Sequence, residues 1–440
     1  TGTLDGNGKT VTVSAPMFDK MNGTVKNLTT AGKIEYAAAA ADEKVHIGAV
    51  AKNSVGGKFE KVTNKAAITV TVATKECRVG GICGSVGTAA ATFVNCRNEA
   101  AISGTEATGG ICGEAQKLDT TFEDCYNKGA ISSSGTKSGV AAGGIIGYSG
   151  TDIITLKNCT NDGNITSGYR AGGIQGDARK SANVTYCINN GTVKGDNISG
   201  GIVGYTGDSS INFGTTVKNC INNGEVTGTG GTTGGAAGIL GYAWADNASN
   251  VKATTMENCI NNGNINLVNK GFASEFVAYT NSQYTVIKNC IGVGKINATG
   301  NESDLFLCIV GMSNSDITKY TIENLFIADG GATKLLSWAT DEANAKNRVE
   351  FSAVDGKNLE GSETVKAITR GELNADFVAK ANTAIGSELF ALKDGKVVFA
   401  SSTPAPTPTG DTAVYVAVAA VAAVVILGTA LVSKKRRIAE

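Results

Sequence analysis

The chain has 440 residues, and its composition already excludes several classes of function. Basic and acidic residues each number 39, so the formal net charge is zero, whereas a nucleic-acid-binding protein carries a basic surplus. The single histidine, His46, excludes a multi-histidine metal site within one chain and argues against a histidine-based catalytic triad.

The chain opens on a strand-like segment. It starts at Thr1 without a signal peptide, and residues 1–10 combine alternating polar residues with Asp-Gly-Asn-Gly turn signals. We therefore expect an N-terminally truncated fragment whose first domain, residues 1–328, is a repeat region.

One repeated unit reads Asn-Cys-x-Asn-x-Gly-x-Ile, with clear copies at 158–165, 219–226 and 258–265. Successive copies of its cysteine position lie 28 to 39 residues apart. The positions are Leu28, Val62, Cys96, Cys125, Cys159, Cys187, Cys220, Cys259, Cys290 and Leu325. A fixed period of this size indicates a stacked repeat architecture.

A second unit, Gly-Gly-Ile-x-Gly, alternates with the first and starts at Gly80, Gly109, Gly143, Gly172 and Gly200. Each repeat thus holds three short strand-like runs, such as 143–148, 153–159 and 163–166, with glycine at every join. Stacked runs of this kind predict an all-β fold, a parallel β-helix of about ten coils. A β-propeller is the alternative, but its blades need ~40 residues and four strands.

These residues resemble a known repeat family. Residues 200–205 followed by 217–228 look like the GLUG repeat of bacterial surface proteins, and the similarity covers about residues 18–328. The sequence departs from that pattern at Ala237, Glu275 and Gly292. The resemblance implies a β-helix on a cell surface, and it implies no particular activity.

The cysteine position is predicted to be a column of buried free thiols. The same position is leucine or valine at the ends of the array, the total of eleven cysteines is odd, and stacked Cβ vectors suit disulfides poorly. If a disulfide exists, Cys83 and Cys112 are the candidates, with Cys77 close by. No Cys-x-x-Cys spacing supports a zinc site.

Three further positions recur. The asparagine two residues after cysteine predicts a side-chain amide ladder, with a ligand-binding amide row as the alternative. The glycine two residues later is expected to supply a positive φ. A β-branched column is expected in the core: Ile102, Ile131, Ile165, Val193, Val226, Ile265 and Ile296.

Tyrosine recurs three residues after the isoleucine of the second unit. Tyr148, Tyr205, Tyr242 and Tyr279 are candidates for stacking on sugar rings, or else they pack at a coil corner. No acidic position recurs over three neighbouring coils, so the sequence offers no catalytic constellation. We therefore expect no catalytic, cofactor-binding or metal-binding residues, no cofactor, and no enzymatic activity.

Residues 329–400 leave the repeat and are predicted to form a small C-terminal α/β cap over the last coil. Residues 369–372 fit a capping box, and Leu373, Phe377 and Ala381 follow on one helical face. Residues 390–399 fit a hairpin with an Asp-Gly turn.

The C-terminal segments predict an anchor. Residues 401–412 form a Pro/Thr-rich linker, residues 413–432 an uncharged span long enough for a transmembrane helix, and residues 433–440 a basic cytoplasmic tail. This order resembles the sorting signal of Gram-positive wall-anchored proteins. Of its Leu-Pro-x-Thr-Gly motif only Thr409 and Gly410 match, which makes them the candidate sortase-like cleavage site.

The sequence thus predicts a non-enzymatic adhesin or stalk on the surface of a bacterial, Gram-positive cell, with its N-terminal part extracellular. The alternative is a polysaccharide-acting β-helix enzyme, or an accessory region of a larger secreted hydrolase. Expected partners are the membrane through residues 413–432, the cell wall, and glycans or proteins of host or bacterial origin, but no nucleic acid.

Overall fold

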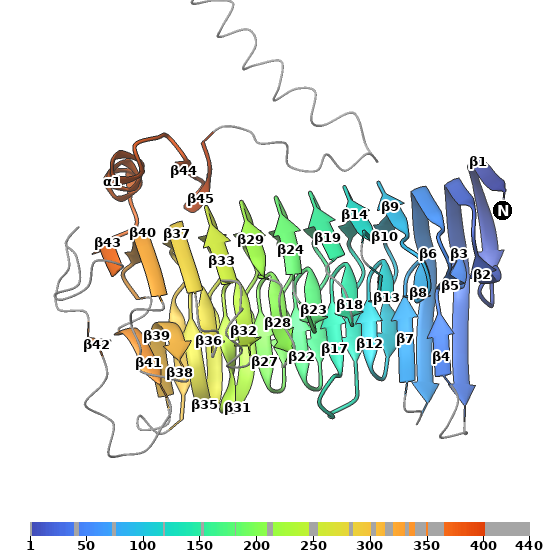
Figure 1. Ribbon diagram of the computed structural model, residues 1–440, viewed down its shortest axis with the longest axis horizontal. Coiled ribbons are helices and arrows are strands. Elements are labelled where there is room, and N and C mark those ends of the chain that lie inside the picture. The colour runs from blue at the N-terminus through green and yellow to red at the C-terminus, as the bar shows by residue number, and fades with distance from the viewer. Residues whose placement is uncertain are drawn as a thin grey trace, which may run out of the picture. The chain divides into compact units, whose positions relative to one another are not determined.

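The protein is an all-β parallel solenoid, seen from the side in Figure 1. The computed structural model describes residues 2–38, 44–72, 76–117, 119–150, 154–180, 182–208, 214–245, 254–280, 285–300, 305–312, 320–330, 334–338, 349–350 and 365–400. All of them belong to the compact unit that spans Thr1–Ala405. In this part of the chain 43 strands form one continuous hydrogen-bonded array.

Each coil passes through five short strands, and each strand pairs in parallel with its copy in the next coil. One coil comprises β14 (Thr121–Glu123), β15 (Tyr126–Asn127), β16 (Ile131–Ser133), β17 (Ala141–Gly143) and β18 (Ile146–Ser149). These pair with β19 (Ile154–Lys157), β20 (Thr160–Asn161), β21 (Ile165–Ser167), β22 (Arg170–Gly172) and β23 (Gln175–Ala178).

The remaining strands repeat this plan. Before these coils lie β1 (Thr3–Val13), β2 (Phe18–Met21), β3 (Thr24–Ala38), β4 (Lys44–Ile47), β5 (Ala51–Ser54), β6 (Lys58–Val72), β7 (Glu76–Gly80), β8 (Cys83–Val86), β9 (Thr92–Val94), β10 (Arg97–Asn98), β11 (Ile102–Gly104), β12 (Ala107–Gly109) and β13 (Cys112–Ala115). After them come β24 (Ala182–Thr185), β25 (Ile188–Asn189), β26 (Val193–Gly195), β27 (Ile198–Gly200), β28 (Val203–Asp208), β29 (Thr216–Lys218), β30 (Ile221–Asn222), β31 (Val226–Ala237), β32 (Leu240–Ala245), β33 (Thr254–Glu257), β34 (Ile260–Asn261), β35 (Ile265–Ser274) and β36 (Val277–Thr280). The last are β37 (Thr285–Gly292), β38 (Ile296–Thr299), β39 (Leu305–Met312), β40 (Tyr320–Ala328), β41 (Lys334–Trp338), β42 (Val349–Glu350) and β43 (Val365–Gly371).

The predicted parallel β-helix is therefore confirmed, with about eight turns rather than ten. The parallel pairing of β43 with β40 also carries the solenoid beyond residue 328, the predicted end of the repeat region.

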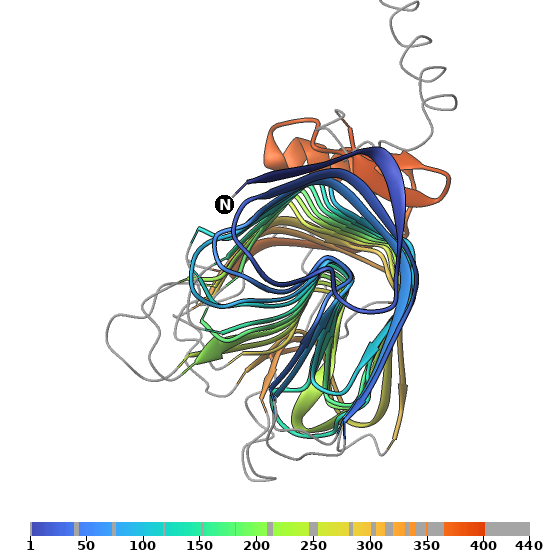
Figure 2. The same cartoon turned by 90° about the vertical axis from the view of Figure 1, so that its right-hand side faces the viewer.

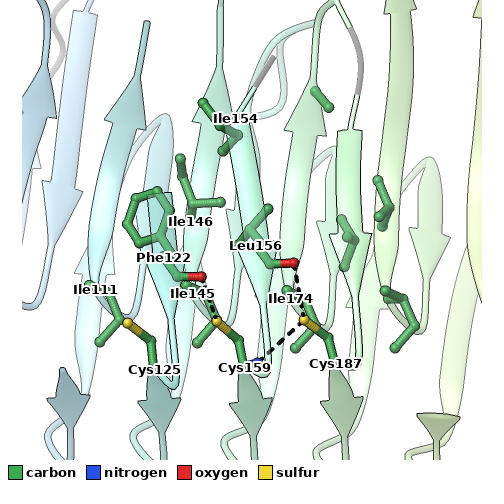
Figure 3. Close-up of a cluster of buried hydrophobic side chains, with 14 of the residues drawn as sticks. Ile111, Phe122, Cys125, Ile145, Ile146, Ile154, Leu156, Cys159, Ile174 and Cys187 are labelled. Carbon is green, nitrogen blue, oxygen red and sulfur yellow. Dashed lines mark hydrogen bonds between the residues drawn. The ribbon is translucent and has the colours of Figure 1, made fainter. Parts of the chain in front are cut away.

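Two hydrophobic cores run along the solenoid instead of one. The first contains the cysteine column and the isoleucines of the second unit; Figure 3 shows Cys125, Cys159 and Cys187 beside Ile111, Ile145 and Ile174. The second contains the predicted β-branched column, including Ile102, Ile131 and Ile165, with Ile296 packed against it. Viewed along the axis in Figure 2, the wall turns inward to the middle of the cross-section.

The predicted thiol column is confirmed. Among the cysteines whose surroundings the structure describes, ten are free and buried: Cys77, Cys83, Cys96, Cys112, Cys125, Cys159, Cys187, Cys220, Cys259 and Cys290. Cys83 and Cys112 are direct partners across β8 and β13 but are not bonded to each other. Burial raises the pKa of thiols such as Cys112 and Cys125, which keeps them protonated and apolar in character.

The glycine column has a different cause from the predicted one. Gly129, Gly163 and Gly191 are not in the left-handed region; a Cβ on each would lie only 1.8 to 2.0 Å from a carbonyl oxygen of the preceding coil. The left-handed residue is instead the one before each cysteine position, with φ between 50° and 60° in every coil, as at Asn95, Asp124 and Asn158. Asparagine and aspartate tolerate that conformation.

The C-terminal helix starts later than predicted. Thr369 lies in β43, and α1 (Ala375–Ile385) begins after Asn374, whose side chain accepts a hydrogen bond from the backbone N–H of Phe377 at 2.9 Å. The capping-box assignment at 369–372 was therefore wrong. The hairpin of β44 (Phe390–Lys393) and β45 (Lys396–Phe399) is confirmed, with its turn at Asp394 and Gly395 in the left-handed region.

The helix and hairpin pack on the flank of the solenoid. Phe377, Val378 and Phe390 form one buried cluster with the outward residues that follow the cysteine positions, Ile221, Ile260, Ile291 and Phe326. Asn262 fixes the hairpin, since its amide donates to the Val397 carbonyl at 2.9 Å and accepts from the Val397 N–H at 3.0 Å. The segment thus covers an apolar stripe on the outer wall.

The predicted C-terminal transmembrane helix is not supported. Among the residues that the structure describes, no helix is long and apolar enough to cross a membrane. Residues 413–432, like the linker at 401–412, the tail at 433–440 and the candidate cleavage residues Thr409 and Gly410, lie outside the described residues.

Candidate functional site

The inward turn of the wall brings together the polar side chains that are the best site candidates. Each Gly-Gly-Ile-x-Gly unit joins two strands, such as β7 and β8, that lie face to face. The last glycine makes this approach possible: a Cβ on Gly84 would lie 2.6 Å from the Ile47 nitrogen, and one on Gly113 would lie 2.5 Å from the Val79 nitrogen. We call this pair of strand columns the infold.

Two columns of side chains face each other across the infold, each in continuous parallel register. The first column is His46, Arg78, Ala107, Ala141, Arg170, Ile198, Gly235 and Phe272. The second column is Asn53, Ser85, Glu114, Tyr148, Asp177, Tyr205, Tyr242 and Tyr279. The four predicted tyrosines therefore lie in one column, together with Glu114 and Asp177.

The N-terminal third of the infold is an ion-pair network around His46. Its Nδ1 lies 2.6 Å from Asn53 Oδ1, and its Nε2 lies 3.1 Å from Glu76 Oε1. The other Glu76 oxygen pairs with Lys44 Nζ at 2.7 Å. Burial alone would raise the pKa of Glu76, but the hydrogen bonds from Lys44 and His46 and the nearby Arg78 charge hold it below its usual value.

Arg78 joins this network to the next coil. Its guanidinium donates from Nε to Glu114 at 2.9 Å and from Nη1 to Glu106 at 2.7 Å. Glu114 is buried and also accepts from Ser85 Oγ at 3.0 Å and Gln116 Nε2 at 2.8 Å. Although burial opposes it, the two carboxylates raise the pKa of Arg78.

The middle third alternates arginines, tyrosines and one aspartate. Asp177 is fully buried and pairs with Arg170 and, at 3.4 Å, with Arg179. The Arg170 guanidinium carbon lies 3.6 Å from the centre of the Tyr205 ring, a cation–π contact. Burial and the Asp177 charge raise the pKa of Tyr148 to about 12, so its hydroxyl stays protonated at neutral pH.

In the C-terminal third the tyrosine rings stack on one another. Ring centroids are 5.3 Å apart for Tyr205 and Tyr242 and 4.9 Å apart for Tyr242 and Tyr279, while Phe272 lies 4.8 Å from Tyr279. All three tyrosines are at most 9% exposed. Their ring faces are covered by aromatic neighbours and by Arg170, so sugar stacking at these positions stays an untested prediction with little free ring surface to support it.

The predicted asparagine ladder is confirmed and lies where the infold meets the opposite wall. From Asn64 to Asn222 each Nδ2 donates to the Oδ1 of the next asparagine along the solenoid at 2.7 to 2.8 Å, and Asn261 is the last acceptor. Each Nδ2 also donates to a carbonyl two residues ahead, for example Asn161 to Gly163 at 2.8 Å. Because both amide hydrogens are used inside the protein, the ladder offers no row of amides to a ligand.

The sequence analysis missed the first column of the infold and the role of His46. The column was detectable in principle, because His46, Arg78 and Arg170 each lie seven residues before a member of the second column. The structure brings His46, Glu76 and Glu114 together so that one donor atom of each lies within 4.8 Å of the others. No family model matches the chain, and neither the curated proteins nor the solved structures contain a match.

Proposed function

We propose that this chain is a non-enzymatic rod displayed on the envelope of a Gram-positive bacterium, where it acts as a stalk or adhesin. The observation that carries the proposal is the way in which repeated polar positions are used. In the asparagine ladder and in the tyrosine stack, side chains bind their own copies in the next coil instead of converging on a pocket. Such columns suit a stiff spacer.

An outer column of charges supports the same function. Lys157 pairs with Glu123 at 2.7 Å, Lys218 with Glu257 at 2.7 Å, and Lys288 with Glu323 at 3.1 Å, each pair joining neighbouring coils. Opposite charges at directly paired positions favour the native register over shifted ones. The resemblance to GLUG repeats and to wall-sorting signals adds the cell surface and the cell wall as the proposed location and partner.

The experiment shortens the rod in register. Deleting residues 159–219 joins Asn158 to Cys220, which keeps the Asn-Cys unit and removes two coils. Cells displaying the shorter chain should keep it folded and protease-resistant, with a reach shorter by ~10 Å at ~4.8 Å per strand spacing. Adhesion to host or bacterial surfaces should then decrease, because the shorter rod extends less far from the cell. Deleting 159–203 instead breaks the register and should give a degraded chain.

A polysaccharide-acting enzyme is the alternative, and one observation favours it: Glu76, Glu106 and Glu114 lie on neighbouring coils of the infold. Each of them is already paired with a cation. Incubating the purified chain with neutral and acidic polysaccharides, and following polymer length, separates the two functions. If the unchanged chain shortens a polymer and Glu114→Gln does not, a hydrolase or lyase would replace the stalk proposal.

A further inference from the structure

We propose that His46, Glu76 and Glu114 form a binding site for a divalent transition-metal ion such as Zn²⁺. The argument starts at His46 Nδ1, which lies 2.6 Å from Asn53 Oδ1. The Asn53 amide nitrogen faces the Asp19 carbonyl oxygen, so the amide oxygen is the atom that faces the ring. His46 therefore donates from Nδ1, and it is Nε2 that would offer a lone pair to a metal ion.

That nitrogen lies 3.1 Å from Glu76 Oε1. With a proton on Nε2 this contact is the hydrogen bond described above; without that proton, both atoms offer lone pairs to a cation between them. A tetrahedral zinc ion with bonds of ~2.1 Å places its donor atoms ~3.4 Å apart. The separation of the two atoms, and the 4.8 Å limit that includes Glu114, suit one shared ion after small side-chain adjustments.

The surrounding groups are those that orient metal ligands. Asn53 holds the imidazole, and Lys44 holds the second oxygen of Glu76. Ser85, Gln116 and Arg78 hold Glu114. Outer hydrogen bonds of this kind fix the tautomer and the carboxylate orientation in metal sites.

The charges are compatible with a divalent ion. A neutral imidazole and two carboxylates balance the charge of Zn²⁺, while Lys44 stays on Glu76 Oε2. Arg78 pairs with Glu114 at 2.9 Å as well as with Glu106 at 2.7 Å, so the ion competes with Arg78 for Glu114, and Glu106 keeps the guanidinium in place. The His46 and Glu76 side chains are 15% and 21% exposed, which leaves the site open to ions and to a fourth, water ligand.

The test uses the full chain with isotopically labelled histidine, because His46 gives the only histidine signals. At pH 8 we expect Zn²⁺ to shift these signals with 1:1 stoichiometry and a chelator to reverse the shift. Calorimetry should show affinity lowered at least ~100-fold in His46→Gln and Glu76→Gln, and ~10- to 100-fold in Asn53→Ala. Glu106→Gln removes a carboxylate of the same network outside the donor trio, so its affinity should change little.

Three outcomes would overturn the proposal. Histidine signals that move with pH but not with Zn²⁺ would mean that the site takes only a proton. Zinc binding that survives in His46→Gln would place the ion elsewhere. A thiolate charge-transfer band on adding Co²⁺ to the native protein would assign the ion to the cysteines. Far-ultraviolet circular dichroism of each variant separates lost binding from lost folding.

Discussion

Glu275 and Gly292 have exchanged the roles that glycine and asparagine hold in the six preceding coils. In those coils, from Gly81 and Asn98 onward, the second glycine of the infold contacts a ladder asparagine, as Gly238 contacts Asn261, where an added Cβ would lie 2.2 Å from the amide carbon. Here the infold residue is a fully buried glutamate and the ladder residue is glycine, where an added Cβ would lie 2.7 Å from Glu275 Cβ and Cγ. The two departures from the repeat therefore compensate for each other, since the larger residue at 275 occupies the space left by the smaller residue at 292.

This pairing predicts strong coupling in a double-mutant cycle. Gly292→Asn should destabilise the protein because the new side chain needs the space of Glu275, and Glu275→Gly should leave a buried cavity. The double variant recreates the Gly238–Asn261 arrangement and should be more stable than the sum of the two effects, by ~1 to 3 kcal/mol. Denaturant unfolding measures all four proteins. Additive free energies would mean that the two positions are not exchanged partners.

The amide ladder should contribute more to stability than the exposed asparagines beside it. Asn161→Ala leaves the Asn127 amide and the Asn189 oxygen without their ladder partners in a fully buried column. Each orphaned group costs ~1 to 3 kcal/mol. Asn190→Ala is the matched control, because Asn190 pairs with Asp162 and Asn223 at the surface and its loss should cost under ~1 kcal/mol. Similar losses in both variants would show that the ladder is not a special source of stability.

Glycine at the stacked turn should be required for space and not for conformation. A Cβ on Gly163 would lie 2.0 Å from the Gly129 carbonyl oxygen, and its φ is not positive. Gly163→Ala should therefore force neighbouring coils apart and cost several kcal/mol. At Gly87 an added Cβ meets nothing within 4 Å and φ is not positive, so Gly87→Ala should be neutral or slightly stabilising. Thermal unfolding of the two alanine variants checks the contrast, and equal midpoints would contradict it.

Much of the fold could be predicted because each repeated position meets the same environment in every coil. The Cys159 column, the Ile165 column and the Asn161 ladder were recognised from recurrence alone, and all three are confirmed. The infold could not be predicted, since Gly-Gly-Ile-x-Gly fits a turn at an outer corner as well as it fits two strands packed face to face. Which of these two arrangements forms depends on how the whole coil closes on itself, and the local sequence does not indicate that closure.

Buried and exposed side chains alternate within the short strand β21, and this alternation gives a sharp test of the register. Ile165 is buried in the second core, Thr166 is exposed, and Ser167, which looks like a loop residue in the sequence, is 1% exposed inside β21. Ile165→Asp should cost several kcal/mol because it buries an unpaired carboxylate, and Thr166→Asp should cost under ~0.5 kcal/mol. Ser167→Asp should also be costly. Proteolysis and thermal unfolding compare the three, and a tolerant Ser167→Asp would mean that this strand ends earlier.

The network around Glu76 makes stability depend on pH in a defined direction. Its partners lower the pKa of Glu76 from the ordinary value of 4.5, so the folded state binds this proton less readily than the unfolded state. The stabilisation is therefore fully present above pH 4.5 and is lost as the pH falls through the folded-state pKa. Glu76→Gln should be less stable than the unchanged chain at pH 7, on the order of 1 kcal/mol for a partly exposed pair.

The same difference should shrink toward zero as the pH falls through the folded-state pKa of Glu76, because the side chain then becomes protonated in both states. Urea unfolding of both proteins between pH 7 and pH 3, in the presence of a chelator, measures it. The chelator is needed because a metal ion bound to Glu76 would add its own pH dependence. Glu123→Gln is the control, since Glu123 pairs with Lys157 on the exposed outer column and its effect should be small at every pH. A difference at Glu76 that does not shrink as the pH falls from 7 to 3 would mean that the side chain acts through packing and not through its charge.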